Sequence, residues 1–304
     1  MKKSDVIKRI ISVVGEDNVK INEPMSRHTS FKVGGPADIF VTPGSDLEIR
    51  DVLKIFRDNG FPVYVMGNGT NLIVRDKGIR GAVLKIYDRF NAISIHGDTL
   101  SADAGALLSC VSKQALEAGL KGIEFACGIP GTVGGAIAMN AGAYNGEIKD
   151  VVYSVDAIDN DFNIITISGP KLEFGYRIST ISKYGYTALR ARFKLGHGNY
   201  EDIKDRMETL TRRRKEKQPL NLPSAGSTFK RPEGHFAAKL IEDSNLKGVS
   251  VGGAEVSKMH SGFIVNNGNA SASDILELIN IVIDEVYKKF NVRLEPEVKI
   301  IGEE

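Results

Sequence analysis

Two glycine-rich segments have the composition of ligand-binding loops. Residues 67–71 read GNGTN and lie between two apolar runs. Because a strand rather than a helix is expected after Gly67 and Gly69, this segment is not a Rossmann dinucleotide-binding fingerprint. It can form a nest of backbone N–H groups that binds a diphosphate, or it can be a tight hairpin with Asn-Gly turn chemistry. The residues alone leave both interpretations open.

The second segment, residues 128–144, is unfavourable for an ordinary helix. It reads GIPGTVGGAIAMNAGAY, and each glycine in a helix interior costs about 0.5–1 kcal/mol relative to alanine. That cost indicates a close approach of the backbone to a flat or phosphorylated ligand. The alternative is a seam of small residues between packed elements.

Three polar residues elsewhere could take part in a reaction. Arg177 ends the sequence FGYR and could form a fork for a carboxylate, although a surface arginine would look the same. Ser227 lies between Gly226 and Thr228 without a GxSxG elbow, which argues against a hydrolase nucleophile. Glu297 follows a proline near the C-terminus, where it could be a charged residue at the start of a strand.

Histidine and cysteine offer no metal chemistry. His28, His235 and His260 are isolated, and neither HxxxH nor CxxC spacing occurs. We therefore expect no protein-bound metal. The two cysteines, Cys110 and Cys127, are expected to be reduced, buried thiols of a cytosolic protein.

Composition narrows the class of protein. The chain has 304 residues, 42% of them hydrophobic, and its 40 basic and 38 acidic residues leave a net charge of +2. This balance suggests neither nucleic acid nor an anionic membrane as a partner. The basic run at residues 212–217 is interpreted as a solvated helix end. No segment approaches the roughly 20 apolar residues of a membrane span, and the N-terminus predicts an amphipathic helix rather than a signal peptide.

Three consecutive domains are expected to position these residues, at 1–85, 86–198 and 199–304. Apolar periodicity predicts helices near residues 46–59, 106–118, 200–217 and 274–290, the last with a capping box at Ser271 and Asp274. Short strands are expected at 38–42, 61–66, 92–95, 152–158, 164–167 and 297–301. This mixture predicts an α+β fold.

Taken in order, the motifs resemble the family of UDP-N-acetylenolpyruvoylglucosamine reductase, also called UDP-N-acetylmuramate dehydrogenase. They span residues 28–298, and each is weak alone. The matching segments are HTSFKVGGPAD at 28–38, GNGTNL at 67–72, GIPGTVGG at 128–135, NAGAY at 140–144, FGYR at 174–177, AGSTFK at 225–230, LKGVSVGGA at 246–254 and LEPEV at 294–298.

The resemblance implies two N-terminal subdomains that bind FAD non-covalently, in the fold of the vanillyl-alcohol-oxidase (PCMH) type. A C-terminal α+β domain would then bind the substrate. The residues matching the family's FAD-binding segments are Gly67, Asn68, Gly69, Thr70, Asn71, Leu72, Ile129, Pro130, Gly131, Thr132, Gly134, Gly135, Ala136, Asn140, Gly142 and Ala143.

The resemblance to this family also implies a reaction and three catalytic residues. NADPH would reduce the flavin, and hydride from flavin N5 would reduce the enolpyruvyl ether of UDP-N-acetylglucosamine to UDP-N-acetylmuramate, a peptidoglycan precursor. Arg177 would stabilise the charge that spreads into the substrate carboxylate, and Glu297, if protonated, would donate a hydrogen bond to it. Ser227 would give the proton to the alpha carbon. The alternative is a sugar or alcohol oxidase of the same flavin fold.

Two departures indicate the family's compact type. The tyrosine-bearing loop that some members carry after FGYR is not expected here, because residues 179–190 run directly to the next strand, and only residues 231–245 separate the serine motif from LKG. Lys217, Lys230, Arg231 and His260 fall near the family's phosphate and nicotinamide contacts. The expected protein is a cytoplasmic monomer whose partners are the UDP-sugar and NADPH.

Overall fold

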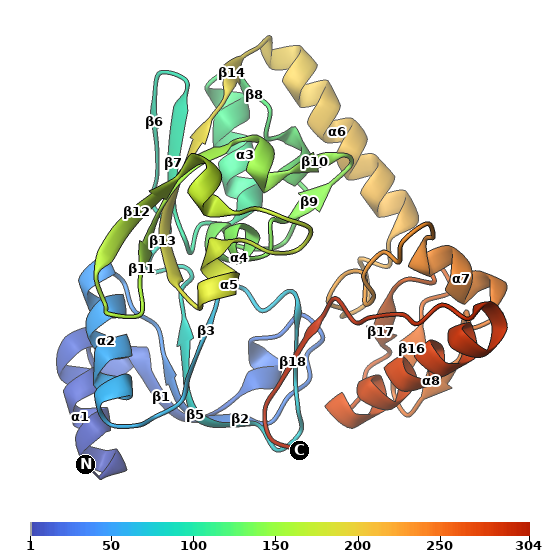
Figure 1. Cartoon of the computed structure of the whole chain (residues 1–304), viewed down its shortest axis with the longest axis horizontal. Helices are drawn as coiled ribbons and strands as arrows, with labels where there is room; N and C mark the ends of the chain where they lie inside the picture. Colours follow the sequence, from blue (N-terminus) through green and yellow to red (C-terminus); the bar gives the residue numbers. More distant parts are fainter. Residues whose placement is uncertain (1) are drawn as a thin grey trace. The chain divides into compact units, whose positions relative to one another are not determined.

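The computed structural model describes residues 2–304, which form two compact units (Figure 1). The first unit comprises the chain up to Lys20, Ile39–Asn68 and Ala82–Arg213. The second comprises Ile21–Asp38, Gly69–Gly81 and Arg214–Glu304. Each unit is thus assembled from segments that are distant in the sequence. The division into three consecutive domains stays a prediction.

The N-terminal part combines two helices with a mixed sheet. The apolar face of α2 (Asp46–Asp58) is buried, and Ser45 caps its start by accepting a hydrogen bond from the Glu48 amide. The four strands follow the order β1-β2-β5-β3, and β3 pairs in parallel with β5. The other elements are α1 (Lys3–Val14), η1 (Glu16–Asn18), β1 (Val19–Pro24), η2 (Met25–Arg27), β2 (Pro36–Val41), β3 (Val63–Met66) and β5 (Ile79–Lys85).

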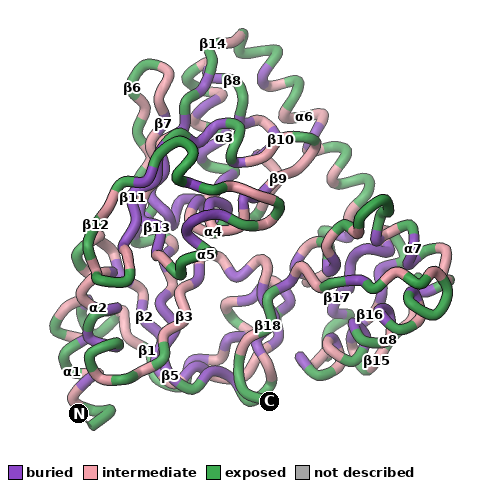
Figure 2. The backbone as a smooth tube through the Cα atoms, viewed as in Figure 1, coloured by how far each residue is buried: buried purple, intermediate pink, exposed green. Residues whose placement is uncertain are grey.

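An antiparallel five-stranded sheet, ordered β12-β11-β13-β7-β6, forms the centre of the first unit. Its strands β11 and β13 are largely buried (Figure 2). The strands are β6 (Ile93–His96), β7 (Thr99–Asp103), β11 (Val152–Ile158), β12 (Ile164–Ser168) and β13 (Thr187–Lys194). The remaining elements of this part are α3 (Leu108–Glu117), β8 (Leu120–Lys121), η3 (Glu124–Ala126), α4 (Val133–Ala138), β9 (Gly142–Ala143), β10 (Gly146–Glu147), η4 (Ile148–Asp150), η5 (Gly169–Leu172), α5 (Thr180–Tyr184), β14 (Gly196–His197) and α6 (Tyr200–Lys217).

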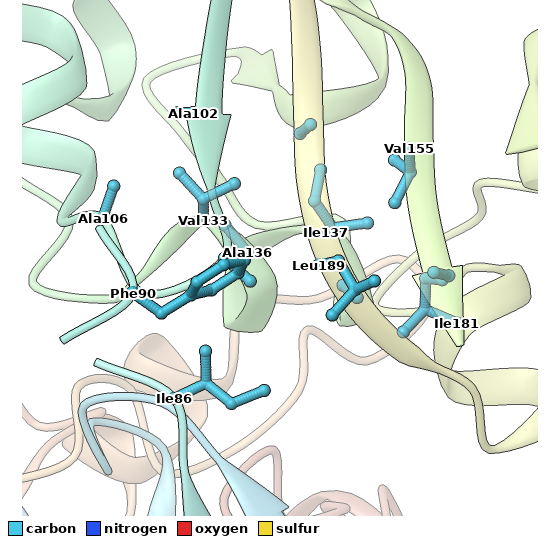
Figure 3. Close-up of a cluster of buried hydrophobic side chains, with 14 of the residues drawn as sticks. Ile86, Phe90, Ala102, Ala106, Val133, Ala136, Ile137, Val155, Ile181 and Leu189 are labelled. Carbon is cyan, nitrogen blue, oxygen red and sulfur yellow. The ribbon is translucent and has the colours of Figure 1, made fainter. Parts of the chain in front are cut away.

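The short helix α4 is anchored to this sheet through its apolar side chains. Val133, Ala136 and Ile137 are buried in one cluster with Leu189 of β13 and Val155 of β11 (Figure 3). Burying apolar surface stabilises such a contact by about 25 cal/mol per Å². The glycine-rich segment therefore has a fixed position, although its intrinsic helix propensity is low.

The second unit packs α8 (Ala272–Phe290) and α7 (Ala237–Asp243) around a small sheet. Ser271 and Asp274 form the predicted capping box of α8, and Asn291 ends the helix in the left-handed conformation. The sheet consists of β15 (Ser250–Val251), β16 (Ala254–Val256) and β17 (Ile264–Asn266). Separately, β4 (Leu72–Val74) pairs in parallel with β18 (Lys299–Ile301).

The α+β prediction is confirmed, and α6 has the predicted bounds, but several local predictions need correction. Strands β5 and β7 were not predicted, and the glycine-rich segment contains the six-residue helix α4. Residues 179–190 do not run straight to the next strand, because they contain α5 before β13 begins. Cys110 is exposed and Cys127 half-buried, so the prediction of buried thiols was wrong. No helix within residues 2–304 is long and apolar enough to cross a membrane.

Candidate active site

The two glycine-rich segments meet within the first unit. A Cβ placed on Gly67 would lie 2.1 Å from Thr132 Oγ1, so a side chain at this position would require Thr132 or one of the loops to shift. The side chain of Asn68 donates a hydrogen bond of 2.9 Å to the Pro130 carbonyl. Glycine at position 67 therefore permits the close approach of the two loops, as the sequence suggested for a ligand-binding segment.

These loops present backbone amides without protein acceptors. Within residues 2–304, the amides of Asn68, Gly131 and Thr132 donate no hydrogen bond, and that of Gly135 only reaches Thr132 Oγ1 at 3.5 Å. Buried or half-buried amides normally find a partner. Successive free N–H groups in a turn form an anion-binding concavity, so the residues present fit the diphosphate of a dinucleotide cofactor.

Other glycines in the second segment are required by packing. A Cβ on Gly134 would lie 2.9 Å from the Ala104 Cβ, and one on Gly142 would lie 2.8 Å from Glu147 Cγ. The Gly134 amide also donates to the Ala104 carbonyl at 2.8 Å. At these two positions the packing seam accounts for glycine, and cofactor contact there stays a prediction.

In the second unit, residues 69–71 contact the C-terminal segment. The Gly69 carbonyl accepts a hydrogen bond from the Ser30 amide at 3.1 Å. Asn71 Nδ2 donates to the Glu297 carbonyl at 3.3 Å, and the Asn71 carbonyl accepts from the Lys299 amide at 3.0 Å. The backbone of Glu297 is thus held by a residue predicted to bind the cofactor.

The structure brings Ser227 and Glu297 onto paired segments of the second unit. Phe229 and Pro296 form an antiparallel bridge, and the Glu297 amide donates to the Thr228 carbonyl at 2.8 Å. Thr228 is buried, and its hydroxyl accepts from the Ile264 amide at 3.1 Å. Ser227 itself is exposed and follows Gly226, whose φ is +78°. Its hydroxyl therefore projects from a fixed backbone.

Arg177 lies in the first unit, at the tip of a tight turn. Gly175 and Ile178 close the turn by an isolated bridge, and the Gly175 amide donates to the Ile178 carbonyl at 3.0 Å. Arg177 is half-buried with a φ of +60°, a left-handed conformation that few non-glycine residues adopt. Its guanidinium carbon lies 5.2 Å from the centre of the Tyr176 ring.

The four predicted substrate contacts differ in their surroundings. Lys217 is exposed at the end of α6, Lys230 forms an ion pair with Glu295 at 2.9 Å, and the Arg231 guanidinium lies 4.1 Å from the centre of the Phe236 ring. His260 Nδ1 accepts from the Gly262 amide at 3.2 Å, and burial lowers the pKa of its ring. His260 is therefore neutral at pH 7 with its proton on Nε2.

Two residues that contact or adjoin the predicted site residues Asn140 and Ser227 were not predicted from the sequence. Glu147 accepts a hydrogen bond of 3.0 Å from Asn140 Nδ2, and Thr228 fixes the serine segment. Thr228 adjoins Ser227 in the motif, so its neighbour could have signalled it. Nothing in the local sequence distinguishes Glu147 from a surface carboxylate.

Comparison with known proteins relates these features to one family. Residues 37–168 match the FAD binding domain model, and residues 218–301 match the model for the C-terminal domain of UDP-N-acetylenolpyruvoylglucosamine reductase. The enzyme of that name from Clostridium botulinum strain Hall is 56% identical over 96% of this chain and 95% of its own. That from Clostridioides difficile strain 630 is 50% identical over the full length of both chains.

Comparison with solved structures leads to the same family and fold. The crystal structure of UDP-N-acetylenolpyruvylglucosamine reductase from Thermus caldophilus has a TM-score of 0.79 at 35% identity, covering 93% of this chain and 97% of that one. Phl p 4, a grass pollen allergen with glucose dehydrogenase activity, has a TM-score of 0.52 at 16% identity over 64% of this chain and 45% of its own, which shows the fold alone. These matches support the predicted FAD-binding fold of the vanillyl-alcohol-oxidase type. The chain therefore belongs to the UDP-N-acetylenolpyruvoylglucosamine reductase family.

Proposed function

We propose that this protein is an NADPH-dependent flavoenzyme that reduces the enolpyruvyl ether of UDP-N-acetylglucosamine to UDP-N-acetylmuramate. The observation that carries the proposal is identity of 50% or more over nearly the whole chain to relatives named for this reduction. The pairing of the Ser227 segment with the Glu297 segment also supports it. The chain is expected to act as a monomer in the cytoplasm, which light scattering and fractionation would test.

Both glycine-rich segments would hold FAD. The free amides of Asn68, Gly131 and Thr132 suit its diphosphate, and Gly67 allows the loops to approach each other. When bound and reduced by NADPH, FAD supplies the hydride for the substrate's vinyl carbon. The protein's task is then to bind the substrate, stabilise its negative charge and provide one proton.

Charge stabilisation is assigned to Arg177 and Glu297. Addition of hydride to the vinyl carbon leaves negative charge on the alpha carbon and the adjoining carboxylate. The guanidinium of Arg177 provides fixed donors for those oxygens, and such preorganised donors contribute about 3–4 kcal/mol each in known enzymes. Glu297 would add a hydrogen bond if its carboxyl is protonated.

The proton donor is assigned to Ser227. A serine hydroxyl is a weak acid, so it can act only on a strong carbon base held within hydrogen-bond reach. Its exposure and the fixed backbone of Thr228 suit this role. The match of the three motifs to the family and the chemistry of the reaction support these three roles.

Separate measurement of the two half-reactions tests the function. The wild-type protein should bleach with NADPH, and the enolpyruvyl substrate should then restore its flavin absorbance. Ser227→Ala should leave the first step nearly intact and slow the second by several orders of magnitude. Ser12→Ala, which removes a surface hydroxyl bonded to the Arg9 carbonyl, is the control. Equal loss of both steps in Ser227→Ala would indicate a structural role.

The same experiment addresses the oxidase alternative. The likeness to Phl p 4 shows only the fold. An oxidase would be bleached by a sugar alone and only slowly by NADPH, and that result would refute the reductase assignment.

A further inference from the structure

The side chain of Asn140 is committed entirely to the protein. This residue follows α4, is fully buried and has a φ of +45°. Its Nδ2 donates to the Gly175 carbonyl at 2.9 Å and to Glu147 Oε2 at 3.0 Å. Its Oδ1 accepts from the Lys149 amide at 3.0 Å. Both ends of the side-chain amide are thus occupied, and the backbone amide donates to the Ile137 carbonyl at 3.3 Å, so only the backbone carbonyl of Asn140 is available to a cofactor.

One of these bonds holds the turn that carries Arg177. Asn140 bonds the carbonyl of Gly175, the residue that opens the turn, while Ser179 Oγ beyond the turn donates to the Ala138 carbonyl at 3.1 Å. The side chains flanking Arg177 provide little packing, since Tyr176 is 53% and Ile178 42% exposed. Hydrogen bonds to the last residue of α4 and to Asn140 beyond it therefore anchor the turn on both sides.

Glu147 orients Asn140. It lies on β10 opposite Gly142 of β9, and the absence of a side chain at Gly142 leaves room for its methylene groups. Its Oε2 accepts from Asn140 Nδ2 and from Lys149 Nζ, the latter at 2.7 Å. The hydrogen bond from Lys149, that from Asn140 and the charge of Arg177 outweigh burial and lower the pKa of Glu147. A carboxylate therefore faces the amide, so the Nδ2 group rather than the oxygen points to it and to Gly175.

We propose that Asn140, oriented by Glu147, is a positioning residue that holds the Arg177 turn where its guanidinium meets the substrate carboxylate. This inference rests on the proposed function. It connects the glycine-rich cofactor segment to Arg177 by side-chain hydrogen bonds within the first unit. Asparagine suits the site because it tolerates the left-handed backbone and carries a donor and an acceptor on one planar group.

A double-mutant cycle with Arg177 tests the proposal. Asn140→Gly removes the amide without straining the left-handed backbone. Misplacing a catalytic group by about 1 Å can cost about 100-fold, so this variant should slow flavin reoxidation by the enolpyruvyl substrate on that order. Flavin reduction by NADPH should be unchanged. In an Arg177→Ala background, Asn140→Gly should cause no further slowing, because the group that it positions is gone.

The double-mutant cycle can also refute the proposal. If Asn140→Gly slows the second half-reaction by the same factor in both backgrounds, Asn140 does not act through Arg177 and the proposal fails. Should Asn140→Gly not fold, Glu147→Ala takes its place in the cycle, with a smaller slowing that must likewise vanish in the Arg177→Ala background. A matched control is Asn59→Ala, which also removes an asparagine bond to a backbone carbonyl, here that of Ile55, and should alter neither step.

Failure of the proposed function would look different. In that case the reduced wild-type protein itself would not be reoxidised by the enolpyruvyl substrate. An active wild type combined with an additive cycle would reject the role of Asn140 alone.

Discussion

Replacing Gly67 with alanine should disrupt the contact between the two glycine-rich segments. The new Cβ would lie 2.1 Å from Thr132 Oγ1 and 3.3 Å from both Thr132 Cβ and Cγ2. Gly67 is not among the residues with positive φ, so alanine brings no backbone strain at this position. The cost of the substitution is therefore steric, and it is directed at one side-chain oxygen.

The loss of stability caused by Gly67→Ala depends on how Thr132 Oγ1 is accommodated. Moving the loops apart or rotating Thr132 resembles the overpacking of a core, which typically costs about 1–3 kcal/mol. Thr132 is also the N-cap of α4, and losing such a cap costs about 1 kcal/mol. Thr132→Ala alone should show only the cap loss. In that background the Thr132 Cβ that remains lies 3.3 Å from the new Cβ, so Gly67→Ala should cost much less than in the wild type.

Urea unfolding of the apoprotein measures this coupling. The double variant should be more stable than the sum of the single effects by about 1–3 kcal/mol. Gly135→Ala is the steric control, because its Cβ would lie at an ordinary 3.6 Å from the same oxygen. Gly67→Ala should also purify with less flavin than the wild type, and the double variant should recover it. Additive single effects would refute the steric reasoning.

Three further predictions concern separate features. Arg177→Ala should slow flavin reoxidation by the enolpyruvyl substrate about 100- to 1,000-fold while sparing reduction by NADPH, and an unchanged second step in stopped-flow absorbance would remove Arg177 from the mechanism. Asp76 accepts hydrogen bonds from the Ala272 and Ser273 amides at 2.8 and 2.9 Å, so Asp76→Ala should lower the free energy of unfolding by about 1–2 kcal/mol, and Asp76→Asn by less. Burial lowers the pKa of His260 below the value of about 6.5 that it has in the unfolded chain. Below that pH the unfolded chain binds a proton more readily than the folded protein, so the wild type loses stability as pH falls. His260→Gln should therefore gain stability relative to the wild type as pH falls from about 7 to about 5. A stability difference that does not change with pH in urea titrations would contradict the last prediction.

Local sequence patterns predicted the elements whose boundaries are set locally. Helix α6 has the predicted bounds, and α8 begins at the predicted capping box of Ser271 and Asp274. Strands β5 and β7 were missed, because a strand is stabilised by partners elsewhere in the chain and its apolar residues need not differ from those of a loop. The exposure of Cys110 was missed for a similar reason, since apolar sequence neighbours do not specify which face of α3 is covered.

The sequence by itself determined the family, since motifs spread over residues 28–298 in a fixed order are specific even when each is weak. It also indicated which glycines and polar residues could matter. Only the tertiary structure decided how they are combined: Gly67 against Thr132, the Ser227 segment against Glu297, and Asn140 beneath the Arg177 turn. These contacts join segments far apart in the chain, and their geometry depends on strand pairing and side-chain packing. Such non-local interactions leave no periodic pattern in the sequence, so the link from Asn140 to the Arg177 turn follows only from the three side-chain hydrogen bonds of Asn140.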